Sequence, residues 1–236
     1  MALDVAADPA LALAVRRALD TVRDPELDES IVSLDFVASV QVDGERVTVE
    51  LRLPTYFCAP NFAYLMVADA HDAVRSVPGV ERAVIRLIDH FASEEINAGI
   101  AGGRGFAGSF PGLADDELAD LRLTFRRKAH RAGQERCASG LVASGWTVSR
   151  LADGTLADVP PGLDLDRLKR RRLELGLPAS DDAPLLVDDA GEPITDLDLP
   201  AQLRFARTTR ISIEGNAALC RGLLEVRYRR DQEVPG

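Results

Sequence analysis

Residues 36–53 read FVASVQVDGERVTVELRL and predict a β-hairpin. Apolar residues occupy every second position on both sides of Asp43-Gly44, and polar residues fill most of the positions between them. A period of two is typical of strands that bury one face. Asp-Gly between two such runs favours a tight turn. We therefore expect two antiparallel strands joined directly to each other.

The segments on either side extend this hairpin to an α-β-β-α-β order. Asp8-Pro9 is typical of a helix start, and Asp24-Pro25 ends that helix because the residue before proline avoids the α region. Residues 61–77 have apolar side chains at helical spacing, and residues 80–88 are rich in β-branched side chains. The expected fold class is α+β, with a small two-layer N-terminal domain of helices packed on a sheet.

Composition changes after this domain. Residues 97–112 are dominated by glycine and alanine and predict a flexible linker. We therefore expect a domain at 1–96, a linker at 97–112 and an α+β extension at 113–236. Within the extension, patterns predict helices at about 115–144, 164–175 and 216–228, and a second hairpin at 146–159 around Asp153-Gly154.

Charge and apolar patterning exclude several function classes. The 236 residues carry a net charge of −10, so phosphate backbones and anionic membrane surfaces should repel the chain. No apolar run is long enough to span a bilayer, and the N-terminus lacks the basic start of a signal peptide. Three widely spaced cysteines form no disulfide framework. These features favour a cytoplasmic protein that binds neither nucleic acid nor membrane.

Cys58 is the main candidate functional residue. It is predicted to lie in the loop between a strand and a helix start, where free N–H groups and the helix dipole favour a thiolate. A thiolate binds soft metals or attacks electrophiles. The alternative is a small buried hydrophobic side chain, which is common for free cysteine. Cys220 lies on the apolar side of the last predicted helix and is expected in the core.

Several short elements in a fixed order resemble one family. They are Asp24-Pro25-Glu26-Leu27, the apolar segment 31–37, the strand 47–53, Thr55 with Cys58, and the segment 77–80. Together they resemble the iron–sulfur cluster assembly domain of SufT-like and PaaD-like proteins. The resemblance covers residues 9–90, and the C-terminal part has no recognised relative.

The resemblance implies roles for individual residues. Cys58 matches the family's metal-binding cysteine, with Thr55, Asp24 and Glu26 in support. Two departures stand out: Tyr56-Phe57 replaces the usual Pro-Gly, and Asp35 replaces a usual glycine. Simpler alternatives remain for the supporting residues, because an Asp-Pro-Glu run is also ordinary turn chemistry and a threonine can simply end a strand.

Ligand counting favours transient binding. An iron–sulfur cluster usually takes four thiolates, and this chain has three distant cysteines. We therefore expect the chain to bind an iron–sulfur cluster or iron only transiently, with none held stably by one chain. We also expect a non-enzymatic maturation factor that acts on a client apoprotein or with the cluster-assembly machinery. A homodimer is one way to share a cluster.

Two alternatives remain open. The first is a non-catalytic protein-interaction module that keeps the fold without metal. The second is an enzyme with Cys58 as nucleophile, for which no histidine is positioned by sequence to act as base.

Overall fold

The computed structural model describes residues 8–111, 118–194 and 197–229, which divide into two compact units. The first is Met1–Ala119 with Asn216–Gly236, and the second is Asp120–Gly215. This division differs from the predicted domains, because the chain returns to the first unit at Asn216 instead of remaining in a separate C-terminal extension. None of the helices in the described ranges has the length and apolarity needed to cross a membrane.

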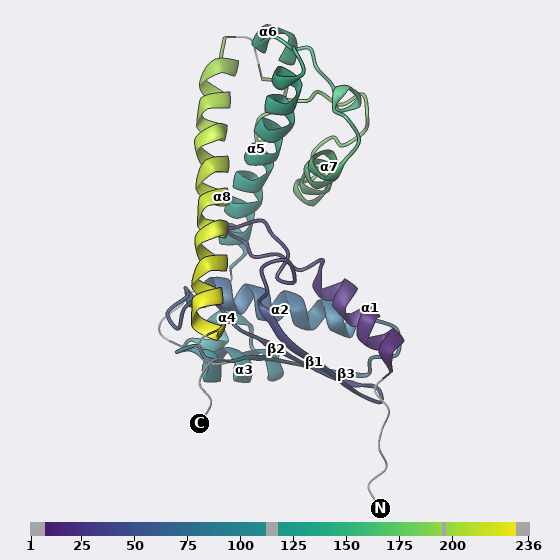
Figure 1. Cartoon of the computed structure of the whole chain (residues 1–236), viewed down its shortest axis with the longest axis vertical. Helices are drawn as coiled ribbons and strands as arrows, with labels where there is room; N and C mark the ends of the chain where they lie inside the picture. The colour runs from purple at the N-terminus through teal and green to yellow at the C-terminus, as the bar shows by residue number, and fades with distance from the viewer. Residues whose placement is uncertain (1–7, 112–117, 195–196, 230–236) are drawn as a thin grey trace, which may run out of the picture. The chain divides into compact units, whose positions relative to one another are not determined.

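The first unit contains a three-stranded sheet in the order β1-β2-β3 (Figure 1). β1 (Val37–Asp43) and β2 (Arg46–Leu51) are antiparallel, with Asp43 opposite Arg46, so the predicted hairpin is confirmed. β3 (Arg82–Leu87) runs parallel to β2. Gly44 in the turn has φ of 57°, a left-handed conformation that glycine adopts without steric cost.

Helices α1 (Pro9–Leu19) and α2 (Pro60–Arg75) lie on one face of this sheet (Figure 1). Asp8 caps α1 by accepting hydrogen bonds from the N–H groups of Ala10 and Leu11, as its sequence predicts. The β2 residues Val47 and Val49 are fully buried against this layer. The α+β fold class and the α-β-β-α-β order are therefore confirmed.

The structure differs from the prediction at residues 97–112. Most of the described residues of this segment lie in two helices, α3 (Ser93–Ala101) and α4 (Gly105–Ser109). Residues 112–117 lie outside the described ranges. Asn97 uses its amide to pair with both backbone groups of Leu87, at 2.8 and 3.0 Å. Ile96 and Phe110 are buried in the core. The described part of this segment is therefore packed on the first unit, which composition alone does not distinguish from a linker.

Gly99 is the position where α3 and α4 approach most closely. A Cβ at Gly99 would lie 1.8 Å from Ser109 Oγ and 2.7 Å from Ser109 Cβ. We expect Gly99→Ala to destabilise the first unit by about 1–3 kcal/mol, because the two helices must separate. Denaturant unfolding followed by tyrosine near-ultraviolet circular dichroism measures this, since all three tyrosines belong to the first unit.

Gly222→Ala is the matched control, because a Cβ at Gly222 would meet no atom within 4 Å. It should leave the first unit unchanged or up to about 1 kcal/mol more stable, since alanine favours helix over glycine. Combining Gly99→Ala with Ser109→Gly should recover part of the lost stability. Equal midpoints for Gly99→Ala and the wild type would contradict the packing explanation.

The regular elements of the second unit, in its described residues, are helices: α5 (Ala119–Ala143), α6 (Val148–Leu151), the 3-10 helix η1 (Leu156–Asp158), α7 (Leu163–Leu175) and the first part of α8 (Leu199–Arg229). Residues 176–194 form turns with isolated β-bridges. The predicted helix at 115–144 is found from Ala119, and residues 115–117 lie outside the description. The predicted hairpin at 146–159 is wrong, because α6 and η1 occupy that segment. The last predicted helix starts at Leu199 rather than at 216.

Arg172 and Gln134 organise the core of the second unit. The Arg172 side chain is fully buried and donates to the carbonyls of Pro178, Pro184 and Leu185 at 3.1, 2.8 and 2.7 Å. It also donates to the Gln134 side-chain oxygen at 3.2 Å. Gln134 in turn pairs with the N–H and carbonyl of Val187. Side chains thus replace the strand ladder that would otherwise satisfy these buried backbone groups.

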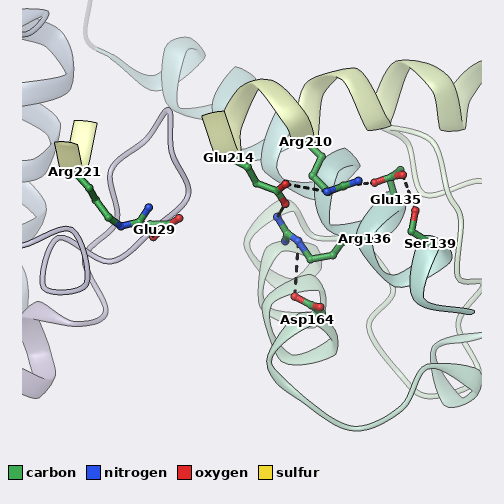
Figure 2. A network of polar contacts seen from close by, with 8 residues as sticks. All are labelled: Glu29, Glu135, Arg136, Ser139, Asp164, Arg210, Glu214 and Arg221. Carbon is green, nitrogen blue, oxygen red and sulfur yellow. Dashed lines mark hydrogen bonds and ion pairs between the residues drawn. The ribbon is translucent and has the colours of Figure 1, made fainter. Parts of the chain in front are cut away.

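A charged network joins α5 to α8 within the same unit (Figure 2). Arg210 lies between Glu135 and Glu214, and Arg136 lies between Glu214 and Asp164. Glu135 is only 3% exposed, so its pairing with Arg210 offsets the cost of burying its charge.

Candidate functional site

Cys58 lies in the loop between β2 and α2, as predicted, and is half-buried against the core of the first unit. Ala59 is the N-terminal cap residue of α2 and Pro60 its first residue. The thiol is therefore placed immediately before a helix start, in a loop that starts at the end of β2.

His90 fixes this loop from the segment that follows β3. Its Nδ1 accepts from the N–H of Ala92 at 3.2 Å, which assigns the ring proton to Nε2. Nε2 then donates to the carbonyl oxygen of Cys58 at 2.8 Å. The N–H of Phe91 donates to the carbonyl of Tyr56 at 3.2 Å. His90 is 3% exposed, and sequence reasoning assigned it no role because its partner lies 32 residues away.

The electrostatics of Cys58 differ from the sequence prediction. Burial, followed by the carboxylate of Asp24, raises the pKa of the Cys58 thiol to about 11, and Cys220 and Glu26 act in the same direction. The N–H of Ala59 opposes this shift but does not overcome it. The predicted helix-stabilised thiolate is therefore wrong: the free thiol is neutral at neutral pH, because desolvation outweighs the N–H groups at the helix start.

The structure brings Asp24 and Glu26 to the same region as Cys58. Asp24 is 6% exposed, and its Oδ1 accepts from the N–H groups of Glu26 and Leu27 at 2.9 and 2.8 Å. Burial raises the pKa of the Asp24 carboxyl to about 6. Asp24 thus performs turn chemistry and also acts electrostatically on the thiol. Thr55 is half-buried in the same loop, three residues before Cys58.

Three exposed aromatic side chains lie in contact with one another at this loop. Tyr56, Phe57 and Phe91 are 47%, 77% and 46% exposed, and their ring centroids lie 5.0 to 6.3 Å apart. We call these three residues the aromatic patch. Exposed aromatic clusters of this kind mark protein–protein interaction sites. The Tyr56-Phe57 departure noted in the sequence is thus part of an exposed surface beside the cysteine.

The end of α8 also contributes to this region, which sequence reasoning missed. Arg227 donates to the carbonyls of Leu53 and Asp89 at 3.0 and 2.6 Å. Arg221 forms an ion pair with Glu29 (Figure 2). Burial raises the pKa of the Cys220 thiol, Asp24 and Glu26 add to that shift, and Arg221 opposes it. The sequence predicts a helix at 216–228 but gives no indication of which part of the first unit it contacts.

The second departure from the family pattern has a backbone explanation. Asp35 has φ of 60°, a left-handed conformation that glycine adopts freely and that aspartate tolerates better than most residues. The guanidinium of Arg52 pairs with the Asp35 carboxylate and holds it there. Asp35 therefore adopts a backbone conformation that glycine would also adopt.

The remaining cysteine and the other buried histidine lie elsewhere. Cys137 and His130 are buried on α5 in the second unit, and burial lowers the pKa of His130 to about 4. Within the described ranges, no three His, Cys, Asp or Glu side chains are grouped so that they could hold a metal ion.

This chain is similar to known proteins over part of its length. The family model described as iron-sulfur cluster assembly protein matches residues 13–85. An iron-sulfur cluster carrier protein of Synechocystis is 35% identical over 74 residues, which are 31% of this chain and 20% of that protein. An uncharacterized protein of Methanocaldococcus jannaschii is 33% identical over 84 residues, which are 35% of this chain and 86% of that protein. The chain therefore spans a small part of the first relative and most of the second.

The small α/β fold with one half-buried cysteine before α2 defines a domain of the metal–sulfur assembly class. The order of motifs and the family match agree on the assignment, and the Methanocaldococcus jannaschii relative is covered over most of its length. This chain belongs to the iron–sulfur cluster assembly protein family.

Proposed function

We propose that the chain is a maturation factor that transiently holds an iron–sulfur cluster or iron on Cys58 and passes it to a client apoprotein. The observation that carries this proposal is the placement of Cys58: a half-buried thiol, in a loop held by His90, inside the segment that matches the family. We infer that it acts in the cytoplasm and not as an enzyme, alone or as a homodimer.

The raised pKa of Cys58 suits a carrier better than a storage site. Iron must displace the thiol proton to bind, and protons compete more strongly when the thiol pKa is high. Bound cargo is therefore held less tightly at neutral pH than by a thiol of low pKa. Weaker holding favours handover to a client whose thiolates form a permanent site.

The aromatic patch supports a protein partner at the same loop. Tyr56, Phe57 and Phe91 expose apolar surface directly beside the thiol, so a docked apoprotein would place its own ligands near Cys58. The same patch is the observation that favours the second candidate, a protein-interaction module that uses the fold without metal.

Anaerobic reconstitution with iron and sulfide tests the proposal. We expect the wild-type chain to gain the visible sulfur-to-iron absorption of a cluster and to pass it to an apo-ferredoxin acceptor. Cys58→Ser should lower cluster loading at least about tenfold, because thiolate is the ligand that clusters require. Cys137→Ser is the matched control, since this cysteine is buried in the second unit.

Two outcomes would contradict metal handling by Cys58. Loading of Cys58→Ser to the wild-type level would remove the cysteine from the mechanism. No loading of the wild-type chain, together with binding to assembly proteins that Phe57→Ser weakens, would favour the interaction module.

A further inference from the structure

The packing of α8 on the first unit brings Cys220 to the region of the Cys58 loop. One turn before it, Asn216 Nδ2 lies 3.5 Å from Glu26 Oε1. One turn after it, Leu224 is buried in the core. Two turns after it, Arg227 donates to the carbonyl of Leu53 at the start of the Cys58 loop. Side chains four residues apart share a helix face, so Cys220 faces the space between the Asp24–Glu26 turn and the Cys58 loop.

Both thiols share the same surroundings. Cys58 and Cys220 are half-buried and pack against the same hydrophobic core. Asp24 and Glu26 raise the pKa of both thiols, after burial as the largest cause, while Arg221 lowers that of Cys220. Cys220 is also among the groups that raise the pKa of Cys58, after burial and Asp24. Two segments 162 residues apart in the sequence thus converge on one site.

We propose that Cys58 and Cys220 together form a two-thiol site that binds the iron edge of a cluster, or another soft thiophilic cation. This inference rests on the proposed function and adds a second ligand to it. Each thiol releases one proton to solvent as its sulfur binds the cation, so the pair supplies two negative charges. The nearby carboxyls of Asp24 and Glu26 favour a cation over an anion at this position.

The number of thiolate ligands also suits transfer of a cluster to a client. A cluster usually takes four thiolates, so a site with two leaves half of its ligand positions for the client or for a second copy of the chain. Transfer then proceeds by exchange of one thiolate for another, with no change in oxidation state. A single thiol supplies only a quarter of these ligands, so a second thiol strengthens the hold of the chain on its cargo.

Cadmium ion is a suitable probe, because thiolate ligation produces an ultraviolet charge-transfer band whose intensity rises with the number of bound sulfurs. The full chain is titrated with Cd²⁺ anaerobically. We expect Cys58→Ser and Cys220→Ser each to retain about half of the wild-type band and to bind Cd²⁺ at least about tenfold more weakly. Cys137→Ser should match the wild type.

Alkylation of the wild-type chain gives a measurement that needs no variant to fold. One equivalent of Cd²⁺ should slow the reaction of N-ethylmaleimide at Cys58 and Cys220 together, as read by mass spectrometry of the two peptides. Alkylation of Cys220 at the same rate with and without Cd²⁺ would overturn the two-thiol site. So would a full wild-type band in Cys220→Ser.

The outcomes separate this inference from the proposed function. If iron–sulfur loading depends on Cys58 but not on Cys220, the maturation function stands and the second ligand is overturned. If loading depends on neither, both fail. Tyrosine near-ultraviolet circular dichroism of Cys220→Ser, compared with the wild type, separates loss of a ligand from loss of the packed α8 end.

Discussion

Replacing Arg172 with methionine should lower the unfolding free energy of the second unit by about 3 kcal/mol. Its guanidinium donates to the carbonyls of Pro178, Pro184 and Leu185 and to Gln134 from a fully buried position. Each acceptor left buried without a donor costs about 1–3 kcal/mol. Removal of a buried charge offsets part of that cost, since burial already lowers the pKa of Arg172 to about 10.

Tryptophan fluorescence during denaturant unfolding measures this effect. Trp146 is the single tryptophan of the chain and packs against the core of the second unit. Arg172→Lys should fall between methionine and the wild type, because an ammonium keeps the charge but cannot reach all four acceptors. Exposed Arg207→Met on α8 is the control and should stay within about 0.5 kcal/mol of the wild type. An unchanged midpoint for Arg172→Met would show that other groups satisfy these carbonyls.

Asp24→Asn should stabilise the first unit by roughly 2–3 kcal/mol at pH 8. Asparagine can still accept from the N–H groups of Glu26 and Leu27, but it places no charge in a buried position. Burial raises the pKa of Asp24 to about 6, against about 4 in an unfolded chain, and each unit of difference corresponds to about 1.4 kcal/mol.

The size of the Asp24→Asn effect should depend on pH. Because the pKa of Asp24 is higher in the folded state, the folded protein binds more protons between about pH 4 and 6. Its stability therefore falls as pH rises through that window and stays lower above it. The advantage of Asp24→Asn should appear across the same window and vanish near pH 3.5, as measured by tyrosine circular dichroism.

Asp43→Asn is the matched control, because Asp43 is exposed in the hairpin turn and should change stability by less than about 0.5 kcal/mol. If Asp24→Asn proves more stable but loads less cluster, the buried carboxyl is retained for function at a cost in stability. Destabilisation at pH 8 would show that another group compensates the Asp24 charge, contrary to its raised pKa.

Much of the first unit was predictable because its signals are local. The hairpin follows from a period of two and Asp43-Gly44, and α1 follows from the cap at Asp8. The glycine-rich segment misled because glycine serves both flexible and tightly packed backbone. Gly99 against Ser109 is a contact of the second kind, and composition does not record what lies opposite a residue.

The candidate site was predictable only in part. The loop position of Cys58 was correct, yet its ionisation was predicted in the wrong direction, since a helix start is a local feature and burial is not. His90 and Cys220 lie 32 and 162 residues from Cys58, so no periodicity within one element reports them.

The amino-acid pattern alone therefore determined the strands, the first helices, the family and the position of Cys58 just before α2. Tertiary packing decided the rest: which distant helix meets that cysteine, which carboxyl is desolvated beside it, and which histidine holds its loop. The physical reason is that these interactions act over different separations along the chain. Steric and hydrogen-bond preferences act over a few residues, whereas burial and Coulomb interactions depend on whatever the folded chain brings within a few ångströms.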